Sequence, residues 1–153
     1  MPFVQNVGRQ EILDGMFEDP GPNSLLIQIC DVGEEHIPAP SVFAKSIRFE
    51  FDDVEDANDP ASISDAQADS IVKELRQAYA NGMNVIVHCY AGIYRSGAVA
   101  LAAEYVGFHR VPPAPGEVHD SNKLVALKMG MAMGRTYRQK TVFEEEFLDR
   151  SAD

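Results

Sequence analysis

The chain has 153 residues, of which 45% are hydrophobic and 24% are charged. This is the length and balance of a single folded domain rather than of a disordered chain, so we expect one domain over residues 1–153. The formal net charge of −11 repels extended polyanions, which argues against nucleic acid or an anionic membrane as a stable partner. A small phosphorylated group is still compatible with that charge, because physiological salt screens the field beyond about 8 Å.

The sequence also argues against a membrane-spanning or a secreted protein. No apolar run approaches the roughly 20 residues that a helix needs to cross a bilayer, and residues 1–15 lack the basic flank and apolar core of a secretory signal. Cys30 and Cys89 are the two cysteines, too few for a disulfide framework, which favours a reducing, cytoplasmic environment. We interpret Cys30 as a core cysteine, the alternative being a redox partner of Cys89, and we expect a monomer.

Two strands are predicted in the first third of the chain. Residues 24–30 (SLLIQIC) form a short apolar run that follows a cluster of turn residues, which is typical of a buried strand. Over residues 47–52, apolar and polar side chains alternate, as in a strand with one buried face. An acidic loop follows and extends to residue 60.

A helix is predicted next. Ser64 and Gln67 have the spacing of a capping box, apolar residues follow at helical spacing, and Asn81-Gly82 ends the segment. The β-branched run at 85–87 predicts a central buried strand.

Three more helices are predicted after that strand, over residues 98–106, around 121–133 and around 141–150. The first ends at Gly107, and a proline-rich connector follows it. The alternation of strands and helices predicts an α/β domain with a central, mainly parallel sheet and helices on both faces.

The loop between the 85–87 strand and the next helix has the sequence HCYAGIYRS, from His88 to Ser96. A strand that runs through a tight loop into a helix is a general phosphate-binding geometry, because backbone N–H groups and the helix N-terminus converge there. Gly92 tolerates the bend, and Arg95 is placed to hold two phosphate oxygens at once. The same groups would keep the thiolate of Cys89 charged.

This loop resembles the HCxxGxxR[S/T] signature of the protein tyrosine phosphatase superfamily, and the layout from Leu25 to Gly107 is similar to that of a small dual-specificity phosphatase. The resemblance implies a dual-specificity phosphatase-like fold and a cysteine-dependent phosphatase that needs no metal or cofactor. Cys89 would be the nucleophile and form a phosphocysteine. Ser96 would donate a hydrogen bond to the departing sulfur, and His88 would support the loop. The substrate phosphate would be bound by Tyr90, Ala91, Gly92, Ile93, Tyr94 and Arg95.

The family also uses an aspartate on an upstream loop as general acid, in the pattern apolar-x-apolar-x-Asp after an alternating strand. Phe49-x-Phe51-x-Asp53 fits this register, and in a continuing strand Asp53 would share the facing of the two phenylalanines while Asp52 would point the opposite way. Asp53 is therefore the leading candidate. The alternatives are Asp56, Asp52 and Asp59.

The expected reaction is hydrolysis of phosphotyrosine, and also of phosphoserine and phosphothreonine if the pocket is shallow. The partner would then be a phosphorylated protein or a small phosphomonoester. Two alternatives stay open: a pseudophosphatase that binds phosphoprotein without turning it over, and a phosphatase of a sugar, nucleotide or lipid phosphate. No lysine lies beside Arg95 in the loop, which argues against highly phosphorylated inositol lipids.

Overall fold

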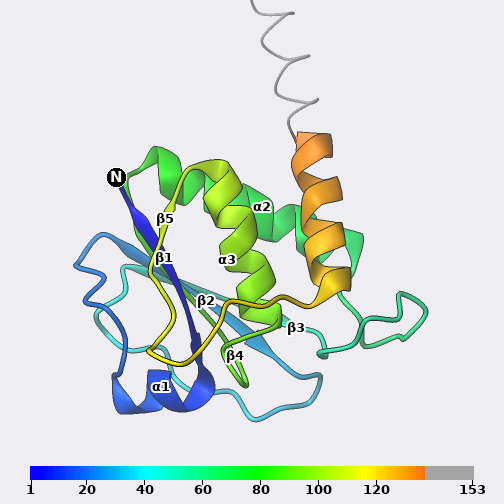
Figure 1. The fold of residues 1–153 in the computed structure, drawn as a ribbon, viewed down its shortest axis with the longest axis horizontal. Helices are drawn as coiled ribbons and strands as arrows, with labels where there is room; N and C mark the ends of the chain where they lie inside the picture. The colour runs from blue at the N-terminus through cyan, green and yellow to red at the C-terminus, as the bar shows by residue number, and fades with distance from the viewer. Residues whose placement is uncertain (137–153) are drawn as a thin grey trace, which may run out of the picture.

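A computed structural model describes residues 1–136 of the chain. Within these residues, five parallel strands form one sheet in the order β3-β2-β4-β1-β5 (Figure 1). The strands are β1 (Phe3–Gly8), β2 (Ser24–Cys30), β3 (Lys45–Glu50), β4 (Asn84–Cys89) and β5 (His109–Arg110). The helices are α1 (Arg9–Asp14), α2 (Asp65–Ala80), α3 (Arg95–Val106) and a helix described over residues 123–136, called here the 123–136 helix.

The two inner strands β2 and β4 explain why the sheet is covered on both sides. Every residue of β2 is buried, as expected for a parallel strand with helices above and below. Ile27 of β2 packs in one hydrophobic cluster, whereas the adjacent Leu26 packs in a second cluster on the opposite face. Val87 and Ile86 of β4 divide in the same way, which follows from the two-residue repeat of a strand.

Different helices cover the two faces (Figure 1). The larger cluster includes Leu75 of α2, Val99 of α3 and Met129 of the 123–136 helix. The smaller cluster contains Ile12 of α1 and Ile37 from the loop after β2. The predicted α/β class, with a parallel sheet and helices on both faces, is confirmed.

Most local predictions are also confirmed. The strand at 24–30 is found with the predicted bounds. Helix α2 begins at the Ser64–Gln67 capping box and is followed by Gly82 with a φ of 67°, where a residue without Cβ adopts the left-handed conformation without strain. The helix predicted around 141–150 lies outside the described residues.

Besides the short strand β5, for which no element was predicted, three features differ from the sequence prediction. β1 and α1 occupy the N-terminal segment, for which no element was predicted, and β1 lies beside β4 in the sheet. β3 ends at Glu50, so the strand does not continue to the acidic loop. α3 begins at Arg95 rather than near Ala98, which places the arginine on the first turn of the helix. Among the described residues, no helix is both long and apolar enough to span a membrane.

Candidate active site

The site lies where three parallel strands end at the same edge of the sheet. β4 ends at Cys89, β2 is followed by Asp31, and β3 is followed by the acidic loop. In open α/β sheets this carboxyl edge is where ligands bind. A cavity of about 390 Å³ opens there, lined by Asp31, Asp52, Asp53, Val54, Cys89, Tyr90, Ala91, Tyr94 and Arg95.

Cys89 is buried at the base of this cavity, with 2% of its surface exposed. Its Sγ accepts a hydrogen bond from the backbone N–H of Gly92 at 3.3 Å and lies 3.2 Å from the hydroxyl oxygen of Ser96. The Gly92 N–H donates a hydrogen bond to sulfur and the Ser96 hydroxyl can donate another, and each of these bonds is stronger when its acceptor is negatively charged. The loop in which the sequence predicts a nucleophile therefore also places hydrogen-bond donors around the sulfur of Cys89.

The β1–α1 corner, where β1 passes into α1, contacts the cysteine loop through hydrogen bonds. The side-chain amide of Asn6 donates to the carbonyl of Gly92 at 2.8 Å, and the backbone N–H of Arg9 donates to the carbonyl of Tyr90 at 3.1 Å. Gly92 has a φ of 77°, and a Cβ added there would lie 2.3 Å from the nitrogen of Gly8. The loop thus needs glycine for its conformation and for this close approach. Sequence reasoning missed the corner because it assigned no structure to the N-terminal segment.

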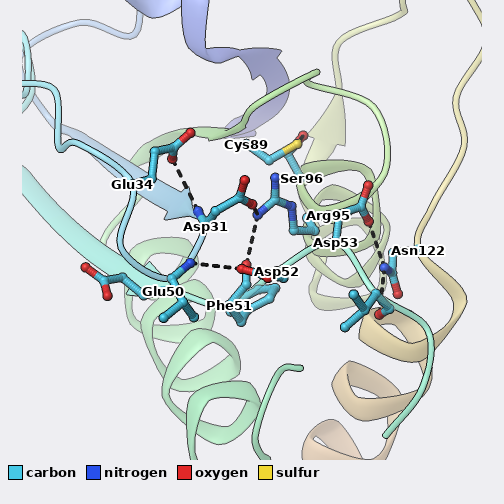
Figure 2. A network of polar contacts seen from close by, with 12 residues as sticks. Asp31, Glu34, Glu50, Phe51, Asp52, Asp53, Cys89, Arg95, Ser96 and Asn122 are labelled. Carbon is cyan, nitrogen blue, oxygen red and sulfur yellow. Dashed lines mark hydrogen bonds and ion pairs between the residues drawn. The ribbon is translucent and has the colours of Figure 1, made fainter. Parts of the chain in front are cut away.

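Among residues 1–136, Arg95 is the one cation that lines the cavity, and 3% of its surface is exposed. Its Nη1 donates to Asp31 Oδ1 at 2.6 Å and to the carbonyl of Phe51 at 2.8 Å (Figure 2). Its Nε is buried and has no hydrogen-bond acceptor in the part of the chain that the structure describes. A buried donor of this kind usually has a partner, and an oxyanion bound above Cys89 would supply one.

His88 is buried beside Cys89, with 1% of its surface exposed. Its Nδ1 lies 3.5 Å from the carbonyl oxygen of Cys89, a long contact, and its Nε2 has no acceptor or donor among residues 1–136. Burial lowers the pKa of His88 to about 4, with smaller contributions from the cations Arg9, Arg48 and Arg95. The imidazole is therefore neutral at physiological pH and adds no positive charge to the loop.

Of the four aspartates considered as general acid, two line the cavity. The side-chain amide of Asn122 donates to Asp53 Oδ1 at 2.8 Å (Figure 2), which leaves the second oxygen of Asp53 available. Asp52 Oδ1 accepts a hydrogen bond from the backbone N–H of Val32 at 2.9 Å.

The other two aspartates hold the acidic loop in shape. Asp56 Oδ1 accepts from the backbone N–H of Asn58 at 2.9 Å, and Asp59 Oδ1 accepts from that of Ala61 at 2.8 Å. Neither lines the cavity.

Asn122 connects the acidic loop to the cysteine loop, and sequence reasoning did not identify it. It is 1% exposed. Besides Asp53, its side-chain amide donates to the carbonyl of Val54 at 3.1 Å, and its backbone N–H donates to the carbonyl of Tyr94 at 2.9 Å. Its Oδ1 accepts from the N–H of Val125 at 3.0 Å. Asparagine just before a helix is a preferred cap, so the sequence signal indicated a helix start rather than a site residue.

The remaining loop positions face in two directions. Tyr90 and Tyr94 are 66% and 42% exposed and line the cavity with Ala91. Ile93 instead lines a second cavity of about 340 Å³ on the side of β1. Cys30 is buried at the end of β2, where burial and the nearby Glu34 carboxylate raise the pKa of its thiol, and this keeps Cys30 in the protonated, less reactive form.

Comparison with solved structures finds proteins of similar fold. No family model and no curated protein sequence matches the chain. A solved structure of OH1 from the Orf virus, described as a tyrosine phosphatase with distinct structural features and triple substrate specificity, aligns with a TM-score of 0.49 at 20% sequence identity. The alignment covers 69% of this chain and 56% of the viral chain, so this chain matches only about half of that protein's length.

Proposed function

We propose that this chain is a cysteine-dependent phosphatase that hydrolyses phosphomonoesters through a phosphocysteine intermediate. One observation carries the proposal: the buried Cys89 sulfur is surrounded by an amide and a hydroxyl donor, and the buried Arg95 beside it has an Nε without an acceptor among residues 1–136. This is a nucleophile next to a binding site for a compact dianion. The likeness of HCYAGIYRS to the tyrosine phosphatase signature agrees with this chemistry.

In the first step, the Cys89 thiolate attacks phosphorus in line with the leaving group. The S–P bond forms while the P–O bond to the leaving group breaks, and the proton of Asp53 goes to the leaving oxygen. The loop amides, the α3 N-terminus and Arg95 hold the remaining phosphate oxygens while their charge redistributes. Asp53 suits this role because one of its oxygens is held by Asn122 and it borders the same cavity as Cys89.

In the second step, water attacks phosphorus and the S–P bond breaks, releasing inorganic phosphate. Asp53, now ionised, takes a proton from the water, and Ser96 donates a hydrogen bond to the departing thiolate from 3.2 Å. His88 stays neutral and supports the loop from the core.

The substrate class that we propose is a phosphorylated protein with phosphotyrosine. Tyr90 and Tyr94 are exposed beside the cavity, and their rings offer surfaces for a phenyl group. A phenyl ring carries its phosphate farther from the peptide backbone than serine or threonine does, so activity on phosphoserine and phosphothreonine depends on how close a backbone can approach Cys89.

The experiment compares the wild type, Cys89→Ser and Cys30→Ala on p-nitrophenyl phosphate. We expect turnover by the wild type and by Cys30→Ala, and none by Cys89→Ser. The three proteins are then compared on phosphotyrosine and phosphothreonine peptides and on soluble inositol phosphates. Peptide binding without turnover by the wild type would indicate a pseudophosphatase, and turnover restricted to nonprotein substrates would reject a protein phosphatase.

A further inference from the structure

Asp31 is a charged residue of the cavity to which the sequence assigned no role. It is the first residue after β2, and its backbone N–H donates to Glu34 Oε2 at 3.2 Å while its carbonyl accepts from the N–H of Glu34 at 3.0 Å. These two bonds fix the turn, and the side chain points to the guanidinium of Arg95 (Figure 2). The position of the Asp31 carboxylate is therefore set by the end of the strand and by its own turn.

The contact with Asp31 determines which edge of Arg95 is left for a ligand. Nη1 donates to two acceptors, Asp31 Oδ1 at 2.6 Å and the Phe51 carbonyl at 2.8 Å, which uses both of its protons. The two acceptors come from the ends of neighbouring strands, so they fix the plane of the guanidinium as well as its direction. What remains is the edge formed by Nε and Nη2, two parallel donors that match two oxygens of a phosphate.

Charge alone would make Asp31 unfavourable at this position. A carboxylate beside the binding site repels a phosphate dianion and offsets part of the charge of Arg95. The side chain of Asp31 is 48% exposed, so water weakens this repulsion. Any benefit of Asp31 must then come from the geometry that it imposes on Arg95.

We propose that Asp31 is a positioning residue that holds Arg95 with its Nε–Nη2 edge toward the phosphate of the substrate. This inference rests on the proposed phosphatase function, because it concerns how that site binds its dianion. It assigns to Asp31 no contact with the substrate and no transfer of a proton.

The test separates geometry from charge with two substitutions. Asp31→Asn keeps an oxygen that accepts from Nη1 but removes the charge, and Asp31→Ala removes both. Glu35→Gln is the matched control, because Glu35 is an exposed acid four residues further along the same loop and its carbonyl oxygen accepts a hydrogen bond from Arg9 rather than from Arg95. For each protein, kcat and KM on p-nitrophenyl phosphate are measured together with the binding of inorganic phosphate by calorimetry, and thermal unfolding checks that the variants fold.

We expect Asp31→Ala to lower kcat/KM by ~10- to 100-fold, with a fall in kcat, because a misplaced Arg95 guanidinium stabilises the transition state less. Asp31→Asn should stay within about threefold of the wild type and bind phosphate at least as tightly, and Glu35→Gln should match the wild type. Equal losses in the two Asp31 variants, or wild-type kcat/KM in Asp31→Ala, would overturn the inference.

Failure of the proposed function is distinguishable from failure of this inference. If the wild type turns over substrate and Asp31→Ala does so equally well, only the role of Asp31 is rejected. If the wild type binds phosphate without turnover, the phosphatase proposal fails, and weaker phosphate binding by Asp31→Ala than by Asp31→Asn would still support the positioning role. If the wild type neither binds phosphate nor turns over substrate, both are rejected.

Discussion

At the scale of single residues, the geometry of the site depends on neighbours that orient its polar groups. Asp53 has one carboxylate oxygen bound by Asn122 at 2.8 Å, and Arg95 has one nitrogen bound by Asp31 at 2.6 Å. In both cases a contact on one side leaves the other side of the group available, as the proposed reaction requires. Such contacts reduce the reorganisation that a reaction would otherwise require.

Replacing Asp53 tests the identity of the general acid. We expect Asp53→Ala to lower kcat on phenyl phosphate by ~10²–10⁴, because the leaving phenoxide would depart without a proton. The loss should be smaller on p-nitrophenyl phosphate, whose leaving group needs less protonation. Both substrates are assayed under the same conditions, with Asp56→Ala as the comparison because Asp56 binds the N–H of Asn58 instead of lining the cavity. A larger loss in Asp56→Ala would transfer the role of the acid to that residue.

At the scale of elements, the residue before the 123–136 helix connects the acidic loop to the cysteine loop. Asn122 bonds to Asp53 and Val54 in the acidic loop and to Tyr94 in the cysteine loop, and its Oδ1 caps the helix at Val125. In the proposed mechanism, the relative position of the acid and the nucleophile therefore depends on a helix that contributes no reacting group.

Two substitutions of Asn122 separate these contacts. Serine is a good helix cap but is too short to reach the acidic loop, whereas alanine also removes the cap. We expect both Asn122→Ser and Asn122→Ala to lower kcat on phenyl phosphate by ~10-fold or more through misplacement of Asp53. Asn122→Ala should in addition lose about 1 kcal/mol of stability relative to Asn122→Ser, measured by urea unfolding. Wild-type kcat in Asn122→Ser would mean that Asn122 serves the helix alone.

At the scale of the whole molecule, the buried His88 makes the stability of the fold depend on pH. It lies at the end of the central strand β4, and burial lowers its pKa to about 4 from an ordinary value of 6.5. The unfolded chain therefore binds a proton at His88 near pH 6.5, whereas the folded protein does so only near pH 4. Between these values the unfolded state holds more protons, so the free energy of unfolding falls as the pH is lowered.

The expected contribution of His88 is a loss of about 3 kcal/mol of stability between pH 7 and pH 4. Urea unfolding of the wild type and of His88→Asn over this range measures it, since the carboxylates contribute to both proteins and cancel in the difference. The loss should be shallower in His88→Asn. A proton NMR titration of the His88 ring in the native wild type measures the pKa of His88 in the folded protein directly, without a variant. A midpoint near 6.5 would contradict the expectation.

The sequence alone determined the features that depend on neighbouring residues. The capping box at Ser64 and Gln67 and the apolar run at 24–30 produce their helix and strand through local geometry, and both were predicted with nearly correct bounds. The loop from His88 to Ser96 is contiguous, so its donors and its sulfur could be recognised together. Its resemblance to a phosphatase signature supplied the leading hypothesis for the chemistry.

Only the tertiary structure decided the features that join distant segments. The Asp31–Arg95 and Asp53–Asn122 contacts connect residues 64 and 69 positions apart, and each depends on which strands are neighbours and on where they end. The N-terminal strand was missed because its role becomes apparent only when it pairs with β4 and places Asn6 behind the loop. Local patterns carry no information about such pairings, since sheet order follows from the burial of the whole core. The sequence thus predicted a phosphate-binding loop at His88–Ser96, and the tertiary structure determined which distant residues contact it.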